Sequence, residues 1–478
     1  MRGMKKQVSR ALSLVLAILL LAAGAPVWAT CGGGGGGGMG GTDEPSYQVP
    51  WKLLKANEPP QKEGLILYWF PASQTELDRS SLRNSRTLTL YAAQCVAMEI
   101  ASINIPAVQK LAAGATLPIA ILAQPDDTVV GKLENSDGKL HVEDVERLVE
   151  NEVKKRESAV KERLESGKSK AKSGDKQAAI AELRSVTAEK CMFPGQAKDA
   201  AKELKKLGVN DVGQIHEGPN FDRAVGARMA AALAAGLAAE EHADYREAER
   251  LYTAAHRMDP NDATPLRFLG EVYRHHIGDW GKARSTFEEI LAMAADPISR
   301  AVALHGLGKM TIHDGDFQKG LRLMERSVET FPLALAYRNL AVYWNSEGNA
   351  AKTEQYVRAA LEAAPRDPYN LVFAAVFEAE SGHTEGALKI ARENEGLLPA
   401  SYNLAAIYAQ AGEKQKALEL LKRHFFEYER YQSVRSKEMM EARVDAVFAS
   451  LKRDPAFVAL TAGADGKLDG TKAMIERR

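Results

Sequence analysis

Three cysteines are the residues of this 478-residue chain best suited to chemistry, because a thiolate is both a nucleophile and a metal ligand. They lie at positions 31, 95 and 191, without the Cys-x-x-Cys spacing of a dithiol exchange site. In an oxidising compartment Cys95 and Cys191 could pair with each other. Cys95 lies inside an apolar run, however, so we expect a buried structural thiol there, with the disulfide as the alternative.

Other motifs that carry chemistry are incomplete. His275 and His276 are adjacent on a predicted helix and point to different faces, which makes chelation of one metal ion difficult. Residues 278–283 contain the lysine of a phosphate-binding loop but lack its frame and the Ser or Thr that follows the lysine. Asp465 and Gly466 lack the remaining ligands of a calcium loop. We therefore predict no catalytic site, no metal site and no cofactor, and we do not expect an enzyme.

The first 29 residues have the pattern of an export signal. A basic head with two arginines and two lysines precedes the apolar run 11–25, and small side chains follow at Val27 and Ala29. This order is typical of a secretory signal peptide, with a retained membrane anchor as the alternative. We predict a signal peptide at residues 1–29 and a protein exported to the periplasm or cell envelope.

Cys31 comes next, directly before the glycine-rich run 32–41. This arrangement resembles a bacterial lipoprotein, in which the cysteine after the signal is acylated and a flexible tether follows. Trp28 and Thr30 depart from that family's pattern, so cleavage after Ala29 without lipidation is the alternative. Residues 30–62 are predicted to be a tether and linker, because glycine-rich chains do not nucleate structure. A lipid on Cys31 is the only membrane attachment that we predict.

The charge balance argues against a nucleic-acid partner. Lys and Arg total 63, as do Asp and Glu, so the formal net charge is +0. Nucleic-acid-binding proteins usually present a basic face or domain. The lysines of residues 157–172 alternate with acidic residues, which is typical of a solvated helix face.

Residues 63–156 are predicted to form a small α/β domain. Apolar runs predict strands at 64–70, 94–101, 117–124 and 128–134, with helices at 78–92, 107–113 and 142–155. This order resembles the thioredoxin fold, and Leu117-Pro118 lies where that family has a cis-proline. The family's exchange site does not carry over, because residues 71–76 contain no cysteine. Ser73 and Thr75 in that stretch are better explained by helix N-capping.

A repeated pattern organises the rest of the chain. Gly-Asp turns or variants of them recur every 30 to 37 residues, at positions 243, 278, 315, 348, 382 and 412. A period near 34 with two helices per unit indicates an α-solenoid. From about residue 224 the units resemble tetratricopeptide repeats, whose small and aromatic positions recur, for example at Gly236, Ala248 and Tyr252. In the third unit Gly320 replaces the usual alanine at a cost of about 1 kcal/mol, so we expect that unit to be the least rigid.

The predicted fold class is therefore mainly α, with a tetratricopeptide-type solenoid after a small α/β thioredoxin-like domain. The solenoid is assigned to residues 224–430. A helical hairpin that resembles a degenerate repeat precedes it at 157–208, followed by a linker rich in Gly, Pro, Asn and Asp at 209–223. Capping helices and a tail are assigned to 431–478, because the last unit of a solenoid has no neighbour to cover it.

In tetratricopeptide proteins the first helix of each unit lines a groove that holds a peptide. Projecting these groove positions onto this chain selects polar residues from four units. Their balance is basic, which favours a protein or peptide partner with acidic segments or a free carboxylate; the alternative is an unoccupied, solvated face. The predicted groove residues are Arg267, Glu271, Arg274, His275, His305, Lys309, His313, Arg338, Asn345 and Tyr402.

The function predicted from these features is a non-enzymatic scaffold or adaptor in the bacterial cell envelope, whose solenoid groove binds a protein partner. The alternative is an accessory subunit of an envelope thiol-redox or sensing pathway that uses a lone cysteine.

Overall fold

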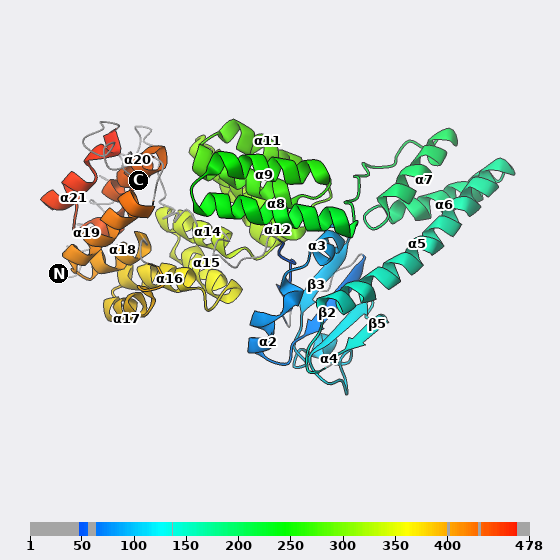
Figure 1. Ribbon diagram of the computed structural model, residues 1–478, viewed down its shortest axis with the longest axis horizontal. Coiled ribbons are helices and arrows are strands. Elements are labelled where there is room, and N and C mark those ends of the chain that lie inside the picture. The colour runs from blue at the N-terminus through cyan, green and yellow to red at the C-terminus, as the bar shows by residue number, and fades with distance from the viewer. Residues whose placement is uncertain (1–46, 56–63, 136, 399–401, 429–431, 466–478) are drawn as a thin grey trace, which may run out of the picture.

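The computed structural model describes residues 47–55, 64–135, 137–398, 402–428 and 432–465. The predicted signal peptide, Cys31 and the glycine run lie outside these ranges. Within them a small α/β unit precedes a long helical solenoid, and Figure 1 shows the sheet packed beside the repeats. In the same ranges no helix combines the length and the apolar character that a membrane span requires.

The α/β unit is built on one sheet with the strand order β1-β3-β2-β4-β5. β1 and β2 each pair with β3 in parallel, whereas β4 pairs antiparallel with both of its neighbours, β2 and β5. Successive residues of a strand point to opposite faces, so Leu67 and Trp69 of β2 pack toward α3 and α5, and Tyr68 and Phe70 pack toward α4. The strands are β1 (Lys52–Leu53), β2 (Leu65–Phe70), β3 (Val96–Ile100), β4 (Ile119–Ala123) and β5 (Val129–Glu134).

One helix predicted in this unit is divided in the structure. The helix predicted over residues 78–92 is two helices separated by a 3₁₀ turn, because Ser85 starts a new helix by accepting a hydrogen bond from the Leu88 N–H at 3.0 Å. The predicted N-cap at Ser73 is confirmed. The Leu117–Pro118 peptide bond is cis. The bounds are α2 (Gln74–Arg79), α3 (Arg86–Ala93), α4 (Pro106–Gln109) and α5 (Val142–Lys172).

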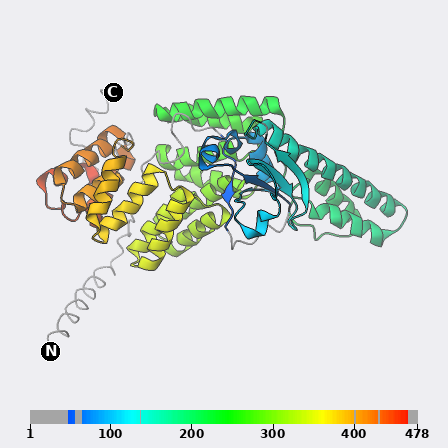
Figure 2. The same cartoon turned by 90° about the horizontal axis from the view of Figure 1, so that it is seen from below.

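Helix α5 continues without interruption through the predicted division between residues 156 and 157. It forms a hairpin with α6 (Lys176–Ala188), which α7 (Pro194–Lys206) extends. Val160 of α5 and Leu183 of α6 belong to the same hydrophobic core as Leu67 of the sheet. The α/β unit and the hairpin therefore share one core, and Figure 2 shows the three helices extending away from the solenoid.

In two segments predicted to be linkers, residues that the structure describes are packed against the rest of the protein. Tyr47 is buried in the core of the first repeats, whereas Trp51 is buried in the core of the α/β unit. The Trp51 indole N–H donates to the Leu82 carbonyl at 2.7 Å, and β1 follows directly. In the second segment, Val212 and Phe221 pack against the core of the α/β unit.

The predicted α-solenoid is confirmed as a series of helix pairs. We call the first helix of each pair an A helix and the second a B helix. The A helices are α8 (Arg223–Glu241), α10 (Thr264–Glu271), α12 (Pro297–His313), α14 (Ala334–Ser346), α16 (Pro368–Glu380) and α18 (Tyr402–Gln410). The B helices are α9 (Tyr245–Met258), α11 (Trp280–Leu291), α13 (Phe317–Thr330), α15 (Ala350–Ala363), α17 (Thr384–Asn394) and α19 (Lys414–Arg423).

The turns within the pairs have the conformation that the sequence pattern implied. All six turn positions have positive φ, with alanine at Ala243 and glycine at the other five. The residue after the turn caps the B helix in four of the pairs, as Asp316 does for the Lys319 N–H at 3.1 Å. Gly174 and Asp175 repeat this geometry between α5 and α6.

Gly320 lies at a close contact between the two helices of the third unit, the unit that is expected to be the least rigid. A Cβ atom at this position would lie 2.6 Å from the Gly308 carbonyl oxygen and 2.4 Å from Cγ1 of Ile312. Glycine therefore permits α12 and α13 to approach closely. The same principle places the ring of Tyr252 against Gly236, as the spacing of small and aromatic residues predicted.

The end of the solenoid is covered by further helices. A π-helix (His424–Tyr428) follows α19, and α20 (Gln432–Val444), a 3₁₀ turn (Ala446–Phe448), α21 (Pro455–Leu460) and a last 3₁₀ turn (Ala462–Asp465) complete the described chain. The buried His424 Nε2 lies 2.9 Å from a carboxylate oxygen of Glu438, and Phe448 is fully buried in the same core.

The α/β unit contacts the solenoid along one edge, at connections between successive repeats. Arg86 of α3 donates to Asp259 at 2.7 Å and to Asp262 at 3.0 Å, in the segment between α9 and α10. Farther along, Arg366 pairs with Asp78 of α2 at 2.9 Å. The Arg86 contacts are buried and the Arg366 pair is exposed, so the first contact is the main anchor.

Candidate functional site

Five of the predicted groove residues lie together on the second and third A helices, namely on α10 with the π-helix that follows it and on α12. We call them, with two neighbours that were not predicted, the A-helix cluster. A π-helix (Val272–Ile277) continues α10 and accommodates the extra residues of the second unit, and π-helical turns are frequent at functional sites. The A-helix cluster comprises Glu240, Glu271, Arg274, His275, His276, His305 and Lys309.

Glu271 is the centre of the cluster. Its carboxylate accepts a hydrogen bond from Arg274 at 2.6 Å and lies 3.3 Å from Nε2 of His275. Burial opposes ionisation, but Arg274 and His275 outweigh it and hold the pKa of Glu271 well below its usual value. Burial and the charge of Arg274 lower the pKa of His275. At neutral pH this group is therefore an ion pair beside a neutral imidazole.

His305 and Lys309 come from the neighbouring helix α12. His305 is buried, and its Nε2 contacts the Asn339 amide nitrogen of α14 at 2.5 Å. Burial and Arg274 keep the pKa of His305 well below its usual value, and its Nδ1 has no hydrogen-bond partner in the described chain. Lys309 is half-buried and forms no ion pair with any described residue. Lys309 is therefore the cation of this cluster that remains open to a ligand.

The pattern analysis missed Glu240 and His276. Burial raises the pKa of Glu240 to about 7, and the carboxylate accepts a hydrogen bond from the Tyr252 hydroxyl. His276 lies 3.7 Å from Glu240 and stacks on Tyr245, and burial lowers its pKa to about 3. Glu240 precedes His275 by 35 residues, one repeat length, so projection of the groove positions into the first unit could have found it.

Arg267 and Arg338 are buried inside the solenoid, with 2% and 5% of their surfaces exposed. Arg338 donates to the Asn370 side chain on the next A helix and lies over the ring of Tyr369 at 4.8 Å. The charge of Arg267 favours ionisation of buried Asp296, although burial raises the pKa of that carboxyl overall. In the structure these two cations stabilise the repeats and are not open to a partner.

The remaining predicted groove residues lie away from the cluster. The Tyr402 hydroxyl donates to Asp445 at 3.1 Å, so this side chain is covered by the C-terminal helices. The ring of His313 packs edge-on against Trp280 at 5.3 Å, beside the turn of the second unit. Asn345 is exposed on α14 and donates to Glu380 at 3.4 Å.

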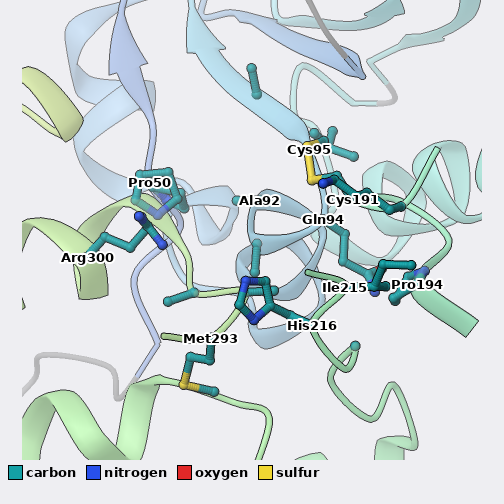
Figure 3. A pocket seen from close by; sticks show the side chains of 18 of the residues that line it. Pro50, Ala92, Gln94, Cys95, Cys191, Pro194, Ile215, His216, Met293 and Arg300 are labelled. Carbon is teal, nitrogen blue, oxygen red and sulfur yellow. A yellow bond between two sulfur atoms is a disulfide. The ribbon is translucent and has the colours of Figure 1, made fainter. Parts of the chain in front are cut away.

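A second candidate site is a cavity between the α/β unit and the solenoid. Its volume is about 340 Å³, within the usual range of ligand pockets. Figure 3 shows a disulfide between Cys95 and Cys191 on one side of it and Arg300 on the other. The disulfide corrects the expectation of a free thiol at Cys95. Local sequence could not reveal it, because the two Cα atoms are 5.9 Å apart after a separation of 96 residues.

The charges that line this cavity are all of one sign. Lys190 and Arg300 are the charged residues of its wall, His216 and other polar or apolar side chains complete it, and none of the lining residues is acidic. Lys190 and Arg300 form no ion pair with any residue that the structure describes. Within the same residues no group of three or more His, Cys, Asp or Glu side chains is arranged to hold a metal ion.

Comparison with known proteins identifies the class of the repeats. The family profile described as tetratricopeptide repeat matches residues 233–297 and 314–368. This chain therefore contains tetratricopeptide repeats arranged in an α-solenoid. Protein CTR9 homolog from Arabidopsis thaliana is 23% identical over 229 residues, which are 37% of this chain and 21% of that protein. The chain thus spans about a fifth of the length of this curated relative.

Similar solved structures include a tetratricopeptide repeat protein from Parabacteroides merdae, which is 14% identical with a TM-score of 0.30 over 64% of this chain and 99% of that one. The Cut9–Hcn1 hetero-tetramer of APC/C is 12% identical with a TM-score of 0.35, over 63% and 55%. The human IFIT1 dimer with m7Gppp-AAAA is 13% identical with a TM-score of 0.32, over 63% and 89%. Structural similarity at these TM-scores does not indicate a function.

Proposed function

We propose that this protein is a non-enzymatic scaffold or adaptor that binds a protein or peptide partner on the A-helix face of its solenoid. Tetratricopeptide repeats generally bind proteins, and the structure offers a fixed surface for this purpose. The observation that carries the proposal is the A-helix cluster, in which Glu271, His275 and Lys309 remain partly exposed. The buried cations Arg267, Arg274 and Arg338 hold that surface in place.

The charge of the cluster favours a partner with an acidic segment or a free carboxylate. Arg274 is already neutralised by Glu271, whereas Lys309 is not matched by any carboxylate in the described chain. A carboxylate supplied by the partner would complete that pair and be partly shielded from water, which strengthens a charge-assisted hydrogen bond.

We further propose that the α/β unit is thioredoxin-like and acts by packing or binding. The strand order, the register of β2 with β3 and β4, and the cis-proline before β4 support this assignment. Residues 71–76 contain no cysteine for dithiol exchange. The alternative that relies on a lone thiol is not proposed, because Cys95 and Cys191 are joined to each other.

The proposed location is the bacterial cell envelope. The basis is the sequence of residues 1–41, with a signal peptide at 1–29 and possible acylation of Cys31. Metabolic labelling with a fatty-acid analogue, comparing wild type with Cys31→Ala, tests the anchor. Labelling that is equal in the two proteins would contradict lipidation at this residue.

Partner capture tests the function. A photo-crosslinking residue placed at Asn345 of the full chain should trap a partner in the cells that produce it, and the Lys309→Glu substitution should reduce the yield. Lys110→Glu is the matched control, because Lys110 is an exposed lysine of the α/β unit. If crosslinking in the Lys309→Glu and Lys110→Glu variants yields the same proteins in the same amounts as in wild type, the proposal that the partner binds the A-helix face is wrong.

A further inference from the structure

The disulfide lies at the end of the sheet opposite to residues 71–76. β2 and β3 are parallel, and Leu65 pairs with Val96, so Cys95 lies where both strands begin. Phe70 pairs with Ile119 at the other end, beside the cis-proline. The cavity and its disulfide are therefore spatially separate from the position at which thioredoxin-like proteins carry their cysteines.

The two cysteines of the disulfide differ in their exposure to solvent. Cys191 is exposed, in the turn between α6 and α7, whereas Cys95 is half-buried between α3 and β3. Both line the cavity. Cys95 also has φ of 59°, a left-handed conformation that is uncommon for residues other than glycine. Cys191 is therefore the residue of the pair that is more accessible to a thiol from solvent.

The surrounding charge selects the kind of thiol. Lys190 is adjacent to Cys191 in the chain, and His216 and Arg300 line the same space with no acidic side chain among the lining residues. In Figure 3 Arg300 and the disulfide face the cavity from different sides. A molecule with a thiol at one end and an anionic group at the other could approach Cys191 while its anion lies near a cation.

We propose that the Cys95–Cys191 disulfide is an exchange site for small anionic thiols, independent of partner binding by the solenoid. The thiolate attacks Sγ of Cys191 and forms a mixed disulfide, the Cys95–Cys191 bond breaks, and Cys95 leaves as a thiolate that takes a proton from water. A second molecule of the thiol attacks the mixed disulfide, is joined to the first as a small disulfide, and leaves Cys191 as a thiol. Two thiols are oxidised and one protein disulfide is reduced.

Reduction kinetics of the folded full chain test this proposal. The probes are 2-mercaptoethanesulfonate and cysteamine, two thiols with the same two-carbon chain and opposite end charges. Each rate is divided by the rate at which the same probe reduces bis(2-hydroxyethyl) disulfide, which removes differences in intrinsic reactivity. One cation at about 6 Å near the surface predicts a preference for the anionic probe of roughly three- to tenfold at low salt. Circular dichroism confirms that the chain stays folded during the reaction.

The substitutions Arg300→Gln and Lys190→Gln should each reduce the preference for the anionic probe, and the double variant should abolish it. Lys110→Gln, on the opposite side of the sheet, should leave the preference unchanged. Equal normalised rates for the two probes in wild type would overturn the proposal, as would reduction that occurs only when the chain unfolds. A preference that survives in the double variant would overturn it as well.

Discussion

The A-helix cluster and the cavity beside the disulfide use charged side chains in different ways. In the cluster, Arg274 is 5% exposed and paired with Glu271, and the neighbouring imidazoles are neutral. In the cavity, Lys190 and Arg300 have no ion pair within the described chain. Most charges of the A-helix cluster stabilise the solenoid, whereas the cavity leaves two cations available.

This difference shows that burial and charge must be considered together when a binding surface is assigned. Arg267 and Arg338 were predicted to bind a partner because of their positions, yet they are buried among other repeat residues. Lys309 and the cavity cations have the property that a ligand site requires, namely a charge that is not yet matched. Four substitutions, each with a control or a second condition, test this contrast.

The Arg86→Ala substitution should cause the largest loss of stability. It would leave Asp259 and Asp262, which are 2% and 1% exposed, without their shared cation, at an expected cost of about 3–5 kcal/mol in the free energy of unfolding. Arg366→Ala is the matched control, because it removes an exposed pair with Asp78 between the same two units and should cost at most about 1 kcal/mol. Urea unfolding measures both, and equal losses would show that the joint has no buried anchor.

Neutralising a paired cation should lower the free energy of unfolding more than neutralising an unpaired one. Arg274→Gln removes the partner of Glu271 and should cost about 2 kcal/mol, less than a fully buried pair because Glu271 is 27% exposed. Arg300→Gln removes no ion pair and should change the unfolding free energy by less than about 0.5 kcal/mol. Thermal and urea unfolding of the two variants check the result. Equal losses of stability in the two variants would contradict the distinction between the paired cation of the cluster and the unpaired cation of the cavity.

Gly320→Ala tests whether the A-helix face is supported by close packing behind it. The added methyl group would collide with the Gly308 carbonyl, and overpacking should cost about 1–3 kcal/mol. Gly386→Ala, in α17, has no atom within 4 Å of its Cβ and should stabilise the protein by about 0.5–1 kcal/mol. Stabilisation by both alanines in urea unfolding would mean that α12 and α13 are not in close contact at Gly320.

Glu240→Gln should have a smaller effect that depends on pH. The pKa of Glu240 is raised to about 7 in the folded protein, so its contribution to stability is present below the unfolded pKa near 4.5 and is lost as pH rises to about 7. The neutral glutamine should therefore match wild type near pH 4.5 and be more stable by about 1–2 kcal/mol at pH 8, because the 21% exposure of Glu240 screens its charge and keeps the effect below the roughly 3 kcal/mol of an unscreened shift. Both proteins are compared in a His276→Asn background, because His276 lies 3.7 Å from Glu240 and has the opposite pH dependence. A difference that is the same at both pH values would contradict the raised pKa.

Much of the fold could be predicted because its determinants are local and repeated. The glycine turns at one-repeat intervals, the aspartate caps after them and the small residue opposite Tyr252 all act within one helix pair. The strands were found for a similar reason, since continuous apolar runs are needed where both faces of a sheet are covered. The continuous α5 was missed because a charged, solvated helix and a domain boundary have similar composition.

The sites depended on contacts that no local pattern contains. Tyr47 donates to Asp262 across 215 residues, and this contact joins the segment before the sheet to the second repeat. The disulfide likewise joins two segments that are 96 residues apart, and the cavity is lined by five separate segments of the chain. The repeat period does predict one contact of the candidate site. His305 and Asn339 are 34 residues apart in sequence and meet in space, so the period indicates which polar residues of adjacent A helices pair.

The most direct test of the central claim is hydrogen exchange of the full chain with and without a captured partner. The A helices α10, α12 and α14 should be protected on binding, together with the π-helix that carries Arg274 and His275, and protection should weaken in Lys309→Glu. The B helices α11, α13 and α15 should be unchanged. Protection confined to the B helices, or to the α/β unit alone, would contradict the proposal that this solenoid binds its partner on the A-helix face.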